Sequence, residues 1–359
     1  MKLAKFEFLK SDGRKWIQYH SEGHPTPRMI DEGLVRPKDW QAPEMRFNVM
    51  RDEWVAVSSS RNNRPFLPPA EYCPLCPMDA YLTDPSGTLC KTDAPIMSHG
   101  YQWAAFENMF PGLAAPGGSG HCEVILYSPK HSGALSQCDT AHIEGLIEVW
   151  KDRSRTVGAL PHVKHVFIFE NKGTEVGVTL HHPHGQLYGF NHHPPFLARE
   201  MEAATEYFKK TRRCLICDIA AREAVGPRLV AKTDHLVAFV PEAARYPYEV
   251  HITTLGHRPL IEDLTQEETS ELASLLKVVM VKYNQLLNME FPYIMVHHQC
   301  GHDEPGALHY HWHIEFYPPY RAAGKLKYLA GVESGTGLFI NDTIPERKAE
   351  ELRALPGTL

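Results

Sequence analysis

At positions 182–186 the chain reads HPHGQ, so His182, His184 and Gln186 occupy alternate positions. On an extended strand alternate side chains share one face, and these three are expected to point the same way. Pro183 restricts the backbone, and Gly185 lets a ligand approach it closely. A histidine-rich surface turn is the plainer interpretation, but the repeat that surrounds the motif favours a reactive site.

The motifs around HPHGQ occur twice in the same order, which indicates an internal duplication. The first half holds CPLC at 73–76, EVILYSPKH at 123–131 and HPHGQ at 182–186. The second half holds CLIC at 214–217, EVHITTLGH at 249–257 and HYHWH at 309–313. His131 precedes His182 by 51 residues and His257 precedes His309 by 52, so His309 is expected to be the counterpart of His182.

The segments between the motifs predict strands and helices. EVILYSPKH, EVHITTLGH, HVFIFEN at 165–171 and YIMVHHQ at 293–299 are rich in β-branched and aromatic residues, as strands are. Apolar residues at helical spacing predict one helix around 143–150 and another around 272–279, the second with a capping box from Thr265 and Glu268. The expected fold class is α+β, with two similar halves that build a mainly antiparallel sheet flanked by helices.

This organisation divides the 359 residues into four parts. Residues 1–45 are a leader whose turn signal is consistent with a hairpin, and residues 46–199 are the first repeat. Residues 200–333 are the second repeat, and residues 334–359 are a charged tail. No linker is long enough to separate two independent domains.

Composition narrows the class of function. The formal net charge of -6 and the pI near 6.4 argue against a general binder of nucleic acid or membrane surfaces. The N-terminus lacks the apolar stretch of a signal peptide, and no stretch approaches the length of a transmembrane helix. We therefore expect a cytoplasmic protein whose cysteines are reduced thiols or metal ligands.

Each Cys-x-x-Cys pair suggests a tetrahedral zinc site, since two thiolates at this spacing suit that geometry. A redox dithiol or a plain core position are the alternatives for the first pair, although the thioredoxin-like context of a redox pair is missing. The first expected ligand set is Cys73, Cys76, His131 and His182. The second, by the repeat, is Cys214, Cys217, His257 and His309, with an empty copy as the alternative.

Two polar loops are candidate phosphate-binding segments. Arg61 and Arg64, in SSSRNNRP, can clamp a phosphate, or they can belong to a solvated basic loop. The loop that begins with Asn171-Lys172-Gly173 and contains Gly177 can present backbone N–H groups to a phosphate. The chain has no P-loop, no G-x-G-x-x-G and no G-x-S-x-G motif.

These motifs together resemble the galactose-1-phosphate uridylyltransferase family of the histidine-triad superfamily. The resemblance runs from about Met45 to Glu333 and includes WxxVxxxRxxRP at 54–65, SPxH at 128–131 and FYPP at 316–319. It implies that each half is a histidine-triad-like unit. It also implies a cytoplasmic homodimer in which Arg61 and Arg64 are supplied across the subunit interface.

The resemblance implies a double displacement through a covalent intermediate. His184 would attack UDP-glucose, release glucose 1-phosphate and pass the uridylyl group to galactose 1-phosphate, while Gln186 donates to the phosphoryl oxygens and the first zinc is structural. The other implied substrate-binding positions, besides the two arginines, are Asn108, Asn171, Gly177, Thr179, Lys327, Tyr328 and Glu333.

The sequence leaves open the identity of the second metal and two alternatives for the function. Some family members hold iron with one glutamate and three histidines, which align with Glu200, His298, His313 and Glu315 here, so the second metal is expected to be zinc or iron, with zinc favoured. The alternatives for function are an ADP-sugar transferase or phosphorylase on the same scaffold, and a catalytically inactive nucleotide-binding module.

Overall fold

The computed structural model describes residues 1–24, 27, 40–63, 66–68, 73–76, 101–114, 120–304 and 306–357. These residues form two compact units. The first consists of Met1–Gln137, Gly145–Val166 and Thr179–Pro195, and the second of Cys138–Glu144, Phe167–Val178 and Phe196–Leu359. No helix among the described residues combines the length and the apolar character that a membrane crossing requires.

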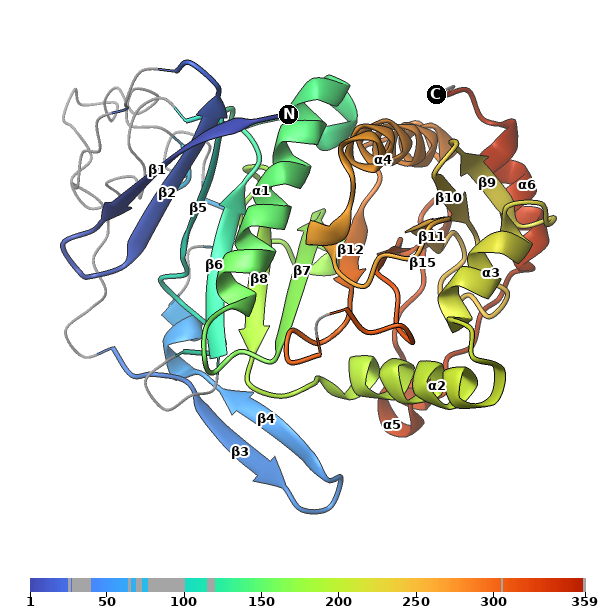
Figure 1. The fold of residues 1–359 in the computed structure, drawn as a ribbon, viewed down its shortest axis with the longest axis horizontal. Coiled ribbons are helices and arrows are strands. Elements are labelled where there is room, and N and C mark those ends of the chain that lie inside the picture. The colour runs from blue at the N-terminus through green and yellow to red at the C-terminus, as the bar shows by residue number, and fades with distance from the viewer. Residues whose placement is uncertain are drawn as a thin grey trace. The chain divides into compact units, whose positions relative to one another are not determined.

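The first unit is built on five antiparallel strands, and the HPHGQ motif leads into the last of them in sheet order. Its strands lie in the order β1 (Leu3–Leu9), β2 (Lys15–Ser21), β5 (Trp103–Glu107), β6 (Gly120–Leu126) and β8 (His184–Phe190), as Figure 1 shows. The short helix η4 (Leu135–Gln137) precedes α1 (Thr140–Gly158), which packs on this sheet from Gly145 onward. A side chain at Gly145 would collide with the Trp103 ring, so the close helix–sheet approach requires glycine there.

A separate hairpin of the first unit leads to the segment that contains Arg61. Its strands are β3 (Glu44–Asn48) and β4 (Glu53–Val57), which pair only with each other among the described residues. The 3₁₀ helix η1 (Ser59–Asn63) follows directly and contains Arg61.

The second unit contains six antiparallel strands and most of the helices. The strand order is β7 (His165–Lys172), β12 (Tyr293–His298), β13 (His313–Tyr317), β11 (Val250–Thr254), β10 (Leu236–Phe239) and β9 (Leu229–Lys232). The helices are α2 (Pro195–Thr211), α3 (Leu215–Glu223), α4 (Gln266–Leu286), α5 (Gly331–Thr336) and α6 (Pro345–Ala354). Shorter elements are η5 (Thr174–Val176), η6 (Ile261–Asp263), β14 (Tyr320–Ala322) and β15 (Lys325–Leu326).

The α+β class with antiparallel sheets and flanking helices is confirmed. Both expected helices are present as α1 and α4, and the capping box at the start of α4 is formed by Thr265 and Glu268. One local expectation needs correction: β8 begins at His184, so His182 precedes the strand and only His184 and Gln186 lie on it. The alternation of half-buried and buried positions along β8 places His184 and Gln186 on one face.

A buried ion pair joins α1 to the sheet of the first unit. Arg153 on α1 donates two hydrogen bonds to the Glu123 carboxylate on β6, at 2.9 and 2.7 Å, and both side chains are 3% exposed. Although burial alone would raise it, Arg153 and then His121 hold the pKa of Glu123 well below its usual range.

Replacing Glu123 by Gln is expected to destabilise the protein by about 3–5 kcal/mol at pH 7, because Arg153 would remain buried without its counter-charge. A carboxylate with a lowered folded-state pKa stabilises the protein above its unfolded pKa of about 4.3 and loses that contribution as the pH falls toward the folded value. The difference in unfolding free energy between wild type and Glu123→Gln should therefore shrink below about pH 4. Urea unfolding at pH 7 and pH 3.5 measures this difference. The control is Glu148→Gln, which breaks the more exposed ion pair with Lys151.

Candidate active site and metal-binding clusters

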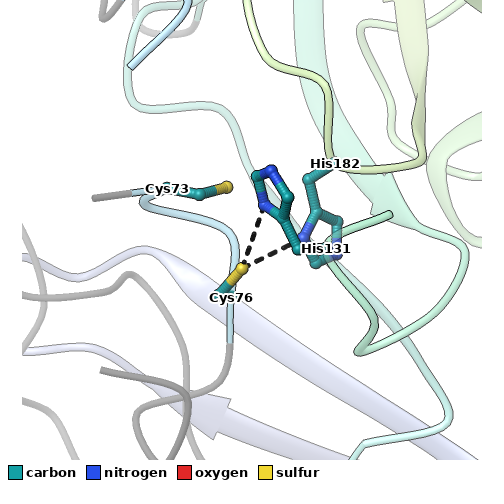
Figure 2. Close-up of side chains that lie close together, drawn as sticks. All are labelled: Cys73, Cys76, His131 and His182. Atoms are coloured by element: carbon teal, nitrogen blue, oxygen red, sulfur yellow. Dashed lines mark hydrogen bonds between the residues drawn. The ribbon is translucent and has the colours of Figure 1, made fainter. Parts of the chain in front are cut away.

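The first Cys-x-x-Cys pair meets two histidines in the first unit. The ligand atoms of Cys73, Cys76, His131 and His182 all lie within 4.8 Å of one another, and Figure 2 shows the four side chains facing a common point. Nδ1 of His131 lies 3.3 Å from the Cys76 sulfur, and Nδ1 of His182 lies 3.5 Å from it. The neighbouring thiol of Cys76 lowers the pKa of Cys73 to about 4, which favours a thiolate in the pair. Two sulfurs and two imidazoles at these distances fit a tetrahedral zinc ion.

Contacts outside this cluster orient its second histidine. Nε2 of His182 lies 2.8 Å from the carbonyl oxygen of Ser128, and the Tyr101 hydroxyl lies 3.4 Å from the same nitrogen. A carbonyl can only accept a hydrogen bond, so Nε2 carries the proton and Nδ1 presents its lone pair to the cluster. This is the tautomer that a metal ligand requires.

The second unit contains an equivalent cluster with one residue different from the expectation. Cys214, Cys217 and His257 are joined by His311, again with all ligand atoms within 4.8 Å. Nδ1 of His257 and of His311 lie 3.4 and 3.2 Å from the Cys217 sulfur. Their Nε2 atoms lie 3.0 Å from the Ala307 carbonyl and 2.6 Å from the Thr254 hydroxyl, which repeats the arrangement around His182.

His309 is not part of this cluster, and the predicted repeat register was wrong by two residues. Its Nε2 instead lies 3.8 Å from Glu304. The correct counterpart of HPHGQ is HWHIE at 311–315, because the connection after His257 is longer than the one after His131. The signal that could have identified it is the final position, where Glu315 matches Gln186 in length and polarity.

A backbone carbonyl two residues earlier holds His184, the proposed nucleophile, in one tautomer. Its Nδ1 lies 2.7 Å from the carbonyl oxygen of His182, so Nδ1 donates and Nε2 keeps a free lone pair. Burial lowers the pKa of His184 from its ordinary value, and the imidazole is therefore neutral near pH 7. A neutral imidazole with an oriented lone pair is suited to attack an electrophilic phosphorus.

The corresponding histidine of the second unit is in a different chemical state. His313 also faces a carbonyl, that of His311 at 3.2 Å, but its Nε2 lies 3.3 Å from the Glu315 carboxylate. Although burial opposes it, Glu315 raises the pKa of His313. A histidine whose second nitrogen faces an anion is a poor nucleophile toward phosphate, so the two halves are not equivalent sites.

A further buried cluster surrounds Glu315. Ligand atoms of Glu200, His298, His313 and Glu315 lie within 4.8 Å, as do those of Glu249, His251 and Glu315. Its carboxylate also accepts hydrogen bonds from Arg245, at 2.9 Å, and from Tyr317. A guanidinium at this carboxylate competes with any cation, so this set fits a metal less well than the two Cys/His clusters.

The predicted substrate-binding residues of the first unit lie on three short segments. Asn108 uses its side-chain oxygen to accept from the Phe110 amide at 2.9 Å, and Arg61 donates to the Phe110 carbonyl at 3.3 Å. Thr179 accepts from the Leu67 amide through its carbonyl. Arg64 lies outside the described residues.

The predicted substrate-binding residues of the second unit lie in two places. Asn171 is on β7, paired with Ile294, and Gly177 ends η5 with a left-handed φ of 81°. Lys327 lies 3.1 Å from Glu333 and also contacts the Ile340 carbonyl, whereas the Tyr328 side chain is exposed. The structure thus pairs Lys327 with Glu333 and leaves Tyr328 facing solvent.

Two sequence families match this chain. The family described as galactose-1-phosphate uridyl transferase, N-terminal domain, matches residues 101–194, and the corresponding C-terminal domain matches residues 200–358. A galactose-1-phosphate uridylyltransferase of Thermotoga maritima is 38% identical over 330 residues, which cover 86% of this chain and 98% of that protein.

Solved structures show similarity over the same extent. A uridylyltransferase structure has a TM-score of 0.74 at 31% identity and covers 86% of this chain and 97% of its own. An ADP-glucose phosphorylase from Arabidopsis thaliana, solved with bound ADP-glucose, has a TM-score of 0.67 at 25% identity and covers 88% of this chain and 100% of its own. Both halves of the chain therefore have counterparts in known structures.

Proposed function

Because this chain belongs to the galactose-1-phosphate uridylyltransferase family, we propose that it moves a uridylyl group between two hexose 1-phosphates through a covalent intermediate on His184. The observation that carries the mechanism is the 2.7 Å contact between His184 Nδ1 and the His182 carbonyl. This contact leaves Nε2 as the nitrogen that can attack.

In the first step Nε2 of His184 attacks the α-phosphorus of UDP-glucose. The P–N bond forms as the bond to the bridging oxygen breaks, and glucose 1-phosphate leaves with the electron pair. In the second step a phosphate oxygen of galactose 1-phosphate attacks the same phosphorus, the P–N bond breaks, and His184 is neutral again. Gln186, on the same face of β8, is placed to donate a hydrogen bond to a non-bridging oxygen as its charge develops.

The remaining positions divide between the two ends of the donor. We assign binding of the phosphates to Arg61, Arg64 and the loop from Asn171 through Gly177 to Thr179. We assign binding of the nucleoside to Asn108. We assign the sugar to Lys327, Tyr328 and Glu333. These roles are supported by the resemblance, and by the placement of Arg61 and Asn108 on adjoining segments.

We propose zinc at both Cys/His clusters. Each provides two sulfurs and two imidazoles, and each imidazole except that of His131 has a described acceptor at its outer nitrogen. Four protein ligands leave no open position, so the first zinc would hold the His182–His184 turn in place and would not take part in bond making. The alternative to a second zinc is iron held by the separate cluster of Glu200, His298, His313 and Glu315.

We also propose that the enzyme is a cytoplasmic homodimer. Exposed apolar side chains on the β3–β4 hairpin support the dimer, since an isolated hairpin is marginally stable unless its apolar face is covered. The largest of them are Phe47, Val49, Met50 and Trp54.

Intact mass after mixing with UDP-glucose alone tests the proposal. A uridylyl-sized adduct is expected, because no acceptor is present to discharge the intermediate. ADP-glucose in a parallel sample tests the other donor, for which the similarity to the Arabidopsis phosphorylase gives a reason. An adduct formed only with ADP-glucose would replace the uridylyl donor by an adenylyl donor, and no adduct with either would contradict covalent catalysis.

His311→Ala and His309→Ala form a matched pair that tests the second metal site. The first is expected to remove one equivalent of metal per chain, because a four-ligand zinc site loses a ligand, and the second to leave the metal content unchanged. Elemental analysis of the purified variants measures this. Equal metal content in both variants would contradict a site at His311.

A further inference from the structure

The hydroxyl of Tyr101 lies where three segments of the first Cys/His cluster meet. It lies 3.3 Å from the carbonyl oxygen of Leu75, between the two cysteines, and 3.1 Å from that of Ser128, and it can donate to either. Nε2 of His182 lies 3.4 Å from the same hydroxyl. One buried group therefore contacts the CPLC loop, the segment that leads to His131, and the ring of His182.

The ring of Tyr101 is fixed by its packing. Tyr101 is 2% exposed and belongs to the core cluster that contains Trp16, Cys73 and Cys76. Its ring meets the Trp16 ring edge to face, with the two centroids 6.4 Å apart. A phenylalanine at this position would keep these apolar contacts and lose only the hydroxyl, so the effect of the hydroxyl can be measured by itself.

The carbonyl of Ser128 connects Tyr101 to the orientation of His182. This carbonyl accepts from Nε2 of His182 at 2.8 Å, and its second lone pair is available to the Tyr101 hydroxyl. The hydrogen bond from Nε2 fixes the tautomer in which Nδ1 of His182 presents its lone pair to the cluster drawn in Figure 2. Tyr101 therefore holds the acceptor that His182 needs in order to bind a metal.

The second Cys/His cluster also has a hydroxyl beside the equivalent histidine, but it comes from another residue. Nε2 of His311 lies 2.6 Å from the Thr254 hydroxyl, which donates to the Gly256 carbonyl at 2.6 Å. Thr254 occupies the position in EVHITTLGH that Ser128 occupies in EVILYSPKH. The two clusters thus share a hydroxyl at the outer nitrogen of the histidine, supplied from different places in the chain.

We infer that Tyr101 is a positioning residue, whose hydroxyl holds the CPLC loop and the Ser128 carbonyl beside His182 and so maintains both the proposed zinc site and the orientation of the proposed nucleophile. The path to the nucleophile is one hydrogen bond long. The carbonyl of His182 accepts from Nδ1 of His184 at 2.7 Å, so a rotation of the His182 peptide changes the direction of Nε2 in His184. The inference rests on the proposed function and on zinc at the first cluster.

Release of zinc to a chromogenic chelator tests the contact with the metal site. Groups that orient metal ligands contribute roughly 10- to 100-fold to metal affinity, so Tyr101→Phe is expected to release one of two zinc equivalents at least about tenfold faster than wild type. Thr254→Val should accelerate release of the other equivalent, and the double variant should release both quickly. A wild-type time course in Tyr101→Phe, or a single fast equivalent in the double variant, would overturn the inference.

Adduct formation with saturating UDP-glucose tests the link to the nucleophile. In Tyr101→Phe protein that still holds its zinc, the rate is expected to fall about fivefold, which is the scale of one lost hydrogen bond. The metal is present in this sample, so the slower rate reports the orientation of His184 and not the loss of zinc. A wild-type rate in zinc-loaded Tyr101→Phe would contradict the inference.

Tyr19→Phe separates positioning from a general loss of stability. It removes another buried hydroxyl of the first unit, which donates to Asp152 at 2.6 Å and lies outside the described metal clusters. Its zinc release and adduct formation are expected to match wild type, even where its Tm falls as far as that of Tyr101→Phe. Defects equal to those of Tyr101→Phe would assign the effect to stability and remove the positioning role.

Failure of the proposed function is distinguishable from failure of this inference. Wild type that forms no adduct with UDP-glucose or with ADP-glucose would contradict the proposed function, and zinc release would still decide whether the Tyr101 hydroxyl supports the metal site. Wild type that binds no zinc would overturn the inference, whatever adduct it forms.

Discussion

Replacing His184 by Asn is expected to abolish turnover, lowering kcat by more than about 10⁴-fold, the scale seen when an enzyme loses its covalent nucleophile. Asparagine keeps a polar side chain of similar size but has no nitrogen that can form the P–N bond. The adduct seen by mass with UDP-glucose should disappear as well. Metal content and the unfolding transition should stay near wild type, because the proposed zinc ligand in this turn is His182 and not His184.

His181→Asn provides the matched control for this substitution. His181 is an exposed histidine three positions before His184 and lies outside the described metal clusters. Its replacement is expected to leave both turnover and adduct formation unchanged. Substantial turnover in His184→Asn, or adduct formation on another residue, would remove His184 as the nucleophile.

The fold was predictable from local patterns, but the register of the repeat was not. Helices α1 and α4 follow apolar spacing that any packed helix must show, and their prediction depended on neighbouring residues alone. The counterpart of His182 depended on the length of a loop, which packing does not constrain. Two adjoining histidine pairs, His309/His311 and His311/His313, then offered the same His-x-His pattern, and the wrong one matched the spacing better.

Contacts between distant side chains were also beyond sequence analysis. Arg61 was predicted to bind a phosphate, but its contact with Tyr188 joins residues 127 positions apart. The Glu123–Arg153 pair joins a strand to a helix in the same way. Such pairs depend on how the helix and strands pack together, and no local pattern of residues marks them.

Replacing Cys73 by Ser is expected to remove one equivalent of metal per chain and to destabilise the protein by at least about 3 kcal/mol, which for a chain of this size lowers Tm by at least roughly 4 °C. Zinc binding contributes directly to folding free energy when its ligands come from separate parts of the chain, and here they come from the CPLC loop, the segment after β6 and the turn before β8. Cys138→Ser, at a half-buried cysteine outside both clusters, is the control and should leave metal content and Tm unchanged.

This substitution should also impair catalysis without touching the nucleophile. The ring of His182 belongs to the proposed zinc site, and its carbonyl accepts the hydrogen bond from His184, so one residue would link the metal to the tautomer of the proposed nucleophile. Loss of zinc frees the His182 turn, and His184 then loses the fixed orientation of Nε2. Adduct formation should therefore slow in Cys73→Ser even at temperatures where the protein is folded, and excess zinc should not restore it. An unchanged rate of adduct formation in folded, zinc-free protein would show that the turn keeps its geometry without the metal.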